Sequence, residues 1–208
     1  MRVLGILASG RGSNCEAILR AEAEGRLDGR VGIVLSDHPD APVLEKARQF
    51  GVESRYVEPG RKGARLTPAA EEAFVEALRD AEVEWVALAG FMRILGENLL
   101  GAFPRRILNI HPSLLPAFPG LHGQRQAFEY GVKIAGCTVH FVDEGVDTGP
   151  ILLQRAVPVR DDDDEESLAA RILEQEHEAY VEAINRVASG DFQIEGRRVL
   201  VRTARSSP

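Results

Sequence analysis

Residues 3–18, with the sequence VLGILASGRGSNCEAI, decide the fold. They open with the apolar run VLGILA, which predicts a buried strand. The next residues, SGRGSN, are polar and rich in glycine and predict a loop. Apolar residues then recur at helical spacing until Gly25, which ends the pattern. A strand, a glycine-containing loop and a helix in this order are typical of the first unit of an α/β sheet.

The same alternation continues outward from this unit. Strands are expected at residues 31–35, 52–57, 85–89 and 106–110, and helices at residues 41–50 and 68–80. Strands that alternate with helices predict an open, twisted, mostly parallel sheet with helices on both of its faces.

The second half of the chain has a different pattern. Its predicted elements are strands at residues 134–142 and 150–159, a long amphipathic helix at residues 168–187, and short strands at residues 191–194 and 197–201. The last two strands flank Glu195-Gly196, which predicts a terminal hairpin. No internal repeat and no linker divides the sequence, so we expect a single domain over residues 1–208.

Composition excludes several classes of protein. The 208 residues are 44% apolar and 27% charged, as in a globular protein, and no apolar run approaches the ~20 residues of a membrane span. The net charge of −7 comes almost entirely from the acidic run at residues 161–166, which argues against a general nucleic-acid binder. Cys15 and Cys137 lack metal-site spacing and are expected to be packed free thiols in a reducing compartment, the cytoplasm.

The loop at residues 9–14 has the composition of a phosphate site. A helix N-terminus offers unpaired N–H groups and the positive end of the helix dipole, which suit a phosphate. Gly12 lets the backbone approach a ligand, and Ser13 and Asn14 add side-chain donors. The loop is neither a Walker A motif nor a complete dinucleotide fingerprint. A plain turn in which Ser13 or Asn14 caps the helix explains these residues equally well.

The stretch NIHPSLLP at residues 109–116 follows a predicted strand. Alternation along that strand places Asn109 and His111 on the same side. Open parallel sheets bind ligands beyond the carboxyl ends of their strands. A histidine and an amide at such a place can stabilise an oxyanion and move a proton. A strand end with a capped histidine is the alternative.

Two acidic segments lie further along the chain. The turn DEGVDTG at residues 143–149 supplies carboxylates that would raise the pKa of a nearby histidine and fix its tautomer, although alone it is typical of an acidic surface loop. The run DDDDEE at residues 161–166 lacks the spaced ligands and central glycine of a calcium loop. We expect a solvated run before a helix, and we predict no metal site.

Short segments spread over most of the chain carry a resemblance to a known family. They are GSN at residues 12–14, LAGFMRIL at 88–95, NIHPSLLP at 109–116, PGLH at 119–122 and DTGP at 147–150. Together they resemble the phosphoribosylglycinamide formyltransferase family. NIHPSLLP alone is shared with other formyl-folate enzymes, among them methionyl-tRNA formyltransferase and formyltetrahydrofolate hydrolase. Those enzymes carry additional domains, for which we expect no room in this chain.

The resemblance implies a fold and a reaction. The fold is a formyltransferase-like α/β sheet with a Rossmann-type first half, ending in a long helix and a hairpin. In the reaction, a formyl group moves from the co-substrate 10-formyltetrahydrofolate directly to the amine of glycinamide ribonucleotide (5′-phosphoribosylglycinamide), as in de novo purine synthesis, without a metal. Other classes stay open at this point: a formyl-folate hydrolase, a non-catalytic formyl-folate-binding relative, and a nucleotide-binding oxidoreductase.

The resemblance also implies how the domain is divided, which partners it binds and where in the cell it acts. The single domain has a phosphate-binding half, residues 1–110, and a folate-binding and C-terminal half, residues 111–208. Its partners are the two small-molecule substrates, with no nucleic acid and no membrane, and it acts in the cytoplasm. Either a monomer or a homodimer is compatible with the sequence.

Finally, the resemblance implies roles for particular residues. The catalytic residues would be Asn109, His111 and Asp147. Ribonucleotide binding falls on Gly12, Ser13, Asn14, Leu173, Glu174, Gln175 and Glu176. Folate binding falls on Arg65, Met92, Arg93, Ile94, Leu95, Asn109, Asp143, Glu144, Gly145, Val146 and Asp147. Arg61 competes with Arg65 for one folate contact, and Arg65 is chosen. A protonated His111 and the Asn109 amide would surround the oxyanion, with Asp147 raising the pKa of His111.

Overall fold

The computed structural model describes residues 2–60, 63–190 and 192–201. Their strands form one open sheet. Within those residues the strand order is β3-β2-β1-β4-β5-β6-β7-β9-β8. The strands are β1 (Arg2–Leu7), β2 (Gly29–Ser36), β3 (Glu53–Tyr56), β4 (Trp85–Leu88), β5 (Ile107–His111), β6 (Ile134–Phe141), β7 (Ile151–Pro158), β8 (Phe192–Glu195) and β9 (Arg198–Val201). The helices are α1 (Ser13–Ala23), α2 (Pro42–Gln49), α3 (Pro68–Asp80), α4 (Glu97–Ala102), α5 (Gly123–Tyr130) and α6 (Glu165–Ala188).

The first half of the chain forms the parallel part of the sheet, as predicted. Neighbouring strands from β3 to β5 all pair in parallel. Helices α1, α2 and α6 cover one face, where Ile18, Val43 and Ile172 lie in one apolar core. Helices α3 and α4 cover the other face through Phe74 and Leu99. Because both faces are covered, the central strands β1 and β4 are apolar runs, whereas the edge strand β3 is polar and alternates in burial.

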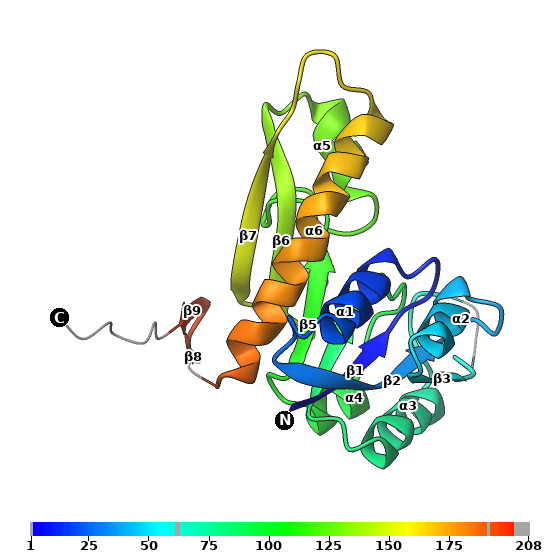
Figure 1. Cartoon of the computed structure of the whole chain (residues 1–208). Helices are drawn as coiled ribbons and strands as arrows, with labels where there is room; N and C mark the ends of the chain where they lie inside the picture. Colours follow the sequence, from blue (N-terminus) through cyan, green and yellow to red (C-terminus); the bar gives the residue numbers. More distant parts are fainter. Residues whose placement is uncertain (1, 61–62, 191, 202–208) are drawn as a thin grey trace.

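The second half turns antiparallel and extends away from the first (Figure 1). Strands β6 and β7 continue the sheet from β5, and α6 runs along them and back across the first half. The hydroxyl of Tyr180, fully buried on α6, donates to the carbonyls of Leu88 at 2.9 Å and Leu108 at 3.0 Å. This contact fixes α6 against β4 and β5, so residues of α6 hold a defined position at the sheet edge.

The structure corrects the predicted elements in several places. Helices α4 and α5 were not predicted, because both are short and carry few apolar residues at helical spacing. Helix α6 begins at Glu165 rather than at the expected residue 168, because Asp164 forms a capping box with Ser167. The hairpin is formed by β8 and β9, and residue 191, predicted to begin it, lies outside the described residues.

No helix among the described residues is both long enough and apolar enough to cross a bilayer.

Candidate active site

Three of the predicted ligand segments, those at residues 9–14, 92–95 and 109–111, lie at the carboxyl ends of three neighbouring strands, β1, β4 and β5. The loop after β1 is joined to the segment after β4 by two hydrogen bonds. The N–H of Ser9 donates to the Gly90 carbonyl at 3.1 Å, and the N–H of Met92 donates to the Ser9 hydroxyl at 2.8 Å. The structure therefore brings the predicted phosphate loop and the predicted folate segment together at one edge of the sheet.

The phosphate loop ends in a helix N-terminus without a side-chain cap. Gly12, not Ser13 or Asn14, is the N-cap residue, and α1 begins at Ser13. Gly12 has φ 70°, and a Cβ added there would lie 2.4 Å from Cγ2 of Val43. Glycine is therefore required by both the backbone and the packing. The capping alternative is wrong, and the first turn of α1 keeps its N–H groups for a ligand.

Helix α6 meets this loop through a buried hydrogen bond. The amide Nδ2 of Asn14 donates to Oε2 of Glu176 at 2.7 Å, and both side chains are buried. Burial raises the pKa of Glu176, and the Asn14 amide opposes the shift. Within the part of the chain that the structure describes, Oδ1 of Asn14 is buried without a hydrogen-bond partner. A polar atom in this state is suited to receive a donor from a ligand.

The other α6 residues of the predicted ribonucleotide site differ in exposure. Leu173 and Gln175 are half-buried, whereas Glu174 is exposed. Leu173 lies one turn before Glu176, on the same side of the helix. Glu174 does not share that side, so the structure does not bring its side chain to the Asn14–Glu176 pair.

The predicted catalytic residues do come together. In β5, Asn109 and His111 point to the same side, and Asp147 reaches both from the turn between β6 and β7. Nδ2 of Asn109 lies 3.4 Å from Oδ1 of Asp147, and Nδ1 of His111 lies 3.3 Å from its Oδ2. Two residues of β5 and one from a distant turn thus form one polar cluster with little exposure.

Asp147 is held in place by its own backbone and by its neighbours. Its φ is 55°, which is rare for a residue other than glycine. Its Oδ2 accepts the N–H of Gly120 at 2.7 Å. Burial alone would raise the pKa of Asp147, but the contacts with His140, the Gly120 N–H and His111 together lower it. Asp147 is therefore a carboxylate at neutral pH, able to accept a proton.

His111 differs from the prediction in one respect. Burial lowers its pKa, and the Phe118 carbonyl and Asp147 oppose this without reversing it. The expected net rise is wrong, because the imidazole is only 4% exposed and loses more hydration than one carboxylate restores. Its Nε2 lies 2.8 Å from the Phe118 carbonyl oxygen and its Nδ1 faces Asp147. Two acceptors thus face the ring, and a proton gained by His111 has a partner on either nitrogen.

The sequence analysis missed a second histidine in the cluster, His140 on β6. Its Nδ1 lies 2.9 Å from the Phe141 carbonyl oxygen, and its Nε2 lies 3.2 Å from Nδ2 of Asn109. Nε2 is also 3.5 Å from Oδ1 of Asp147. The signal that could have found it is strand pairing, since His140 lies directly opposite Asn109 in the β5–β6 ladder.

The predicted folate segment, residues 92–95, lies beside the loop that carries Arg65. The N–H of Ile94 donates to the Ala64 carbonyl at 2.7 Å, and Arg65 pairs with Ile94 in a short parallel bridge. Arg65 and Met92 are exposed, and Leu95 is buried. Arg61 lies outside the described residues.

The side chain of Arg93 points to partners within the protein, whereas the prediction for this segment concerned its backbone. It donates from Nε to Oδ2 of Asp37 at 2.6 Å and also donates to the Gly63 carbonyl. These partners lie at the end of β2 and in the loop before Arg65, so the guanidinium is engaged within the protein.

The other predicted folate segment is the turn at residues 143–147. Oδ1 of Asp143 accepts the N–H of Gly145 at 3.1 Å and the hydroxyl of Thr148 at 2.6 Å, which fixes the turn. Glu144, Gly145 and Val146 are exposed, so their side of the turn is open to a ligand.

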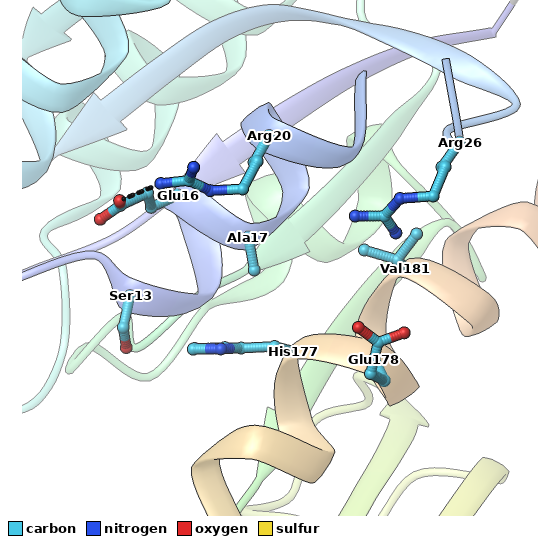
Figure 2. Close-up of a pocket in the computed structure, with 8 residues that line it drawn as sticks. All are labelled: Ser13, Glu16, Ala17, Arg20, Arg26, His177, Glu178 and Val181. Carbon is cyan, nitrogen blue, oxygen red and sulfur yellow. Dashed lines mark hydrogen bonds and ion pairs between the residues drawn. The ribbon is translucent and has the colours of Figure 1, made fainter. Parts of the chain in front are cut away.

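A cavity of about 320 Å³ lies between α1 and α6, beside the phosphate loop (Figure 2). Its lining comprises Ser13, Glu16, Ala17, Arg20, Arg26, His177, Glu178 and Val181. Arg20 is paired with Glu16 at 3.0 Å. Burial lowers the pKa of His177. The cavity shares Ser13 with the loop and so extends the space next to the α1 N-terminus.

Neither cysteine is placed for chemistry. Cys15 and Cys137 are fully buried free thiols, and burial raises the pKa of each to about 12. A thiol in this state is not a nucleophile at neutral pH. Among the described residues, no cluster of three or more His, Cys, Asp or Glu side chains is arranged to hold a metal ion. In the acidic run, Asp163 pairs with Arg171.

Comparison with known proteins agrees with this geometry. The formyl transferase family model matches residues 1–184. The chain is 46% identical over 187 residues to phosphoribosylglycinamide formyltransferase of Bacillus subtilis, covering 90% of this chain and 95% of that one. The solved structure of glycinamide ribonucleotide transformylase 1 from Symbiobacterium toebii matches with a TM-score of 0.91 and 53% identity, covering 97% of this chain and 94% of that one.

A formyltetrahydrofolate deformylase structure from Pseudomonas syringae shares the fold, with a TM-score of 0.88 at 24% identity. This chain covers 65% of that protein, and 96% of this chain is matched.

The chain therefore belongs to the formyl transferase family. Within that family it is an enzyme of the phosphoribosylglycinamide formyltransferase group, the folate-dependent formyltransferases of purine biosynthesis.

Proposed function

We propose that the chain transfers the formyl group of 10-formyltetrahydrofolate to the amine of 5′-phosphoribosylglycinamide, giving formylglycinamide ribonucleotide and tetrahydrofolate. The observation that carries this proposal is the cluster of Asn109, His111 and Asp147 at the carboxyl end of β5, beside the uncapped N-terminus of α1. An oxyanion site and a phosphate site at one sheet edge fit a small phosphorylated amine and an acyl donor.

The ribonucleotide is proposed to bind along α1 and α6. The phosphate lies against the N–H groups of Gly12, Ser13 and Asn14, where the dipole of α1 favours negative charge. The amine faces Glu176, whose carboxyl is already held by the Asn14 amide. Leu173, Glu174 and Gln175 complete the segment on α6, with Leu173 on the side that faces inward.

The folate is proposed to bind across the two exposed segments on the other side of the cluster. Its pterin lies against the backbone of Met92, Arg93, Ile94 and Leu95 and against the turn from Asp143 through Glu144, Gly145 and Val146 to Asp147. Apolar walls with a few backbone donors and acceptors suit a flat heterocycle. Arg65 is exposed beside Ile94, where its guanidinium can meet an acidic part of the folate.

The chemistry follows from the charge that the reaction creates. The amine lone pair attacks the formyl carbon, a carbon–nitrogen bond forms, and the carbonyl electrons move to oxygen. Asn109 donates to this oxyanion. His111 also donates in its protonated form, which burial of the ring disfavours and which Asp147 and the negative charge developing on the oxygen favour. Asp147 is ionised and accepts the proton of the attacking amine through an ordered water. The oxyanion electrons then re-form the carbonyl, the bond to the folate nitrogen breaks, and His111 gives its proton to that nitrogen. The proton held by Asp147 passes to His111, whose Nδ1 faces it, so both groups return to their starting states. No metal and no nucleophilic side chain takes part.

We infer further that residues 1–208 act as one domain, with residues 1–110 holding the phosphate and residues 111–208 completing the folate side. The proposed setting is the cytoplasm, and the active form is a monomer or a homodimer. Light scattering of the purified chain decides between these two forms.

The proposal is tested by product analysis with and without the amine substrate. Purified chain is incubated with 10-formyltetrahydrofolate, and formate and formylated ribonucleotide are quantified. We expect formyl loss only when glycinamide ribonucleotide is present, with one formylated product for each tetrahydrofolate formed. Formate release at the same rate without the amine would instead assign a hydrolase.

A further inference from the structure

A buried ion pair lies next to the folate segment and has no part in the chemistry described above. The carboxylate of Asp37 is fully buried and the side chain of Arg93 is only 11% exposed. Nε of Arg93 lies 2.6 Å from Oδ2 of Asp37, and the same guanidinium donates to the Gly63 carbonyl. His38, which is exposed, places its Nε2 3.6 Å from the same carboxylate oxygen.

The topology shows what this pair connects. Asp37 follows β2 and Arg93 follows β4, and β1 lies between these strands in the sheet. The Arg93 side chain therefore spans the end of β1, where the phosphate loop begins. Gly63 adds a third segment, the loop that leads to Arg65. One guanidinium thus joins the end of β2 to the two segments, residues 92–95 and the 63–65 loop, that the proposed folate site uses.

The same place carries a second set of contacts. The N–H of Ile94 donates to the Ala64 carbonyl at 2.7 Å, and Arg65 pairs with Ile94. Arg93 and Ile94 therefore contact the 63–65 loop from adjacent positions. The backbone of the folate segment and the loop that carries Arg65 move together as long as both sets of contacts persist.

Stability alone does not explain a charged pair at this position. Two buried charges lose hydration, and an apolar pair of similar volume is often as stable or more stable. Among the described residues, Oδ1 of Asp37 is also buried without a hydrogen-bond partner. Unlike an apolar side chain, an arginine supplies a planar group whose hydrogen-bond donors point in fixed directions. Such a group fixes the relative positions of its partners.

We propose that Asp37 and Arg93 are positioning residues for the folate site. Their ion pair fixes the position of residues 92–95 relative to the 63–65 loop, and the Arg93 guanidinium does not itself bind folate. This inference rests on the proposed folate site. It assigns the backbone of Arg93 to folate binding and its side chain to the ion pair.

The test is a double-mutant cycle with KM measured separately for the two substrates. Arg93→Ala and Asp37→Ala are each expected to raise KM for 10-formyltetrahydrofolate by roughly tenfold, because each releases the same loop. KM for the ribonucleotide stays within about twofold, since residues 12–14 are held by the packing of Gly12 against Val43 and by the Asn14–Glu176 hydrogen bond, neither of which involves Arg93. The double variant is expected to match the single variants, because both remove one interaction.

The cycle separates positioning from direct binding. If Arg93 bound folate itself, Arg93→Ala would raise the folate KM by the same factor in the Asp37→Ala background as alone, and the proposal would be overturned. Equal rises in both KM values would also overturn it. Arg55→Ala, which breaks the exposed Arg55–Glu53 pair on β3, is the matched control and should leave both KM values unchanged.

Conservative variants keep the test decisive if an alanine variant does not fold. Asp37→Asn and Arg93→Lys retain a polar partner, and each should raise the folate KM by a smaller factor with the ribonucleotide KM unchanged. Unchanged folate KM in both would contradict the proposal. An unsubstituted chain without formyl transfer would refute the proposed function, whereas an active chain with unaffected variants would refute the ion-pair role alone.

Discussion

The proposed phosphate loop and the proposed catalytic cluster lie at the same sheet edge but are built from different chemical groups. The loop relies on backbone N–H groups and on a glycine that no other residue replaces without strain at φ 70°. The cluster consists of the side chains of Asn109, His111 and Asp147, held by hydrogen bonds across three elements. Backbone sites are disturbed by a change of shape, whereas side-chain sites are disturbed by the loss of one group.

The largest effect is expected from removing a catalytic side chain. His111→Ala and Asn109→Ala should each lower kcat by roughly 10²–10³-fold, the usual cost of a lost oxyanion donor, with KM nearly unchanged. Asp147→Ala should lower kcat by roughly 10²–10⁴-fold, because it removes the group that accepts the proton of the amine. Steady-state kinetics and a thermal unfolding curve measure both quantities. A folded His111→Ala variant with normal kcat would contradict the assignment of the cluster.

A smaller effect, on binding, is expected from a change of shape in the loop. Gly12→Ala places a Cβ 2.4 Å from Val43 and should raise KM for the ribonucleotide by roughly tenfold while KM for folate changes little. Gly25→Ala is the matched control, because Gly25 also has positive φ, of 71°, but an open environment outside the site. Equal changes of both KM values in Gly12→Ala would argue against a phosphate at this loop.

Sequence reasoning predicted the two regions to different extents. The loop was found from local order alone, because a strand, two glycines and a helix are adjacent in the chain. Asn109 and His111 were found from strand alternation. His140 was missed because its relation to Asn109 depends on the pairing of β5 with β6, which no local pattern reports. The ion pair between Arg93 and Asp37 was not predicted for the same reason, since Asp37 is distant in sequence.

The net direction of the His111 pKa shift also could not be predicted from the sequence. It depends on how deeply the ring is buried, and burial outweighs the carboxylate that the sequence places nearby. Helices α4 and α5 show a similar limit, because short helices are stabilised by packing more than by their own residues.

The next effect is the pH dependence of stability at Glu176, the residue of α6 that bonds to Asn14 of the loop. Glu176 has a raised pKa, so the folded protein holds its proton more tightly than the unfolded chain does. The stability that this group contributes is therefore lost as pH rises from the usual glutamate range through the raised pKa. Glu176→Gln removes the loss, so its Tm relative to the parent should increase as the pH rises above the usual glutamate range, which thermal unfolding at a series of pH values measures.

The exposed Glu174→Gln, on the same helix, is the control for that measurement. A Tm difference for Glu176→Gln that is constant with pH would show that the buried carboxyl does not favour its neutral form.

The smallest effect is expected from the cysteine in the first turn of α1. Cys15→Ala should keep kcat within about twofold, because its buried thiol has a pKa of about 12 and takes no part in direct transfer. Tm should fall by a few degrees, since a small cavity replaces the sulfur. Loss of turnover in a folded Cys15→Ala variant would point to a covalent intermediate.

The central claim, that one sheet edge holds both substrates around the cluster, is tested most directly by a crystal structure with tetrahydrofolate and glycinamide ribonucleotide bound. We predict the phosphate within hydrogen-bond distance of the N–H groups at residues 12–14, and the pterin against residues 92–95 and 143–147. The amine of the ribonucleotide should lie between Glu176 and the cluster of Asn109, His111 and Asp147. A phosphate bound away from the N-terminus of α1, or a pterin outside these two segments, would contradict the account.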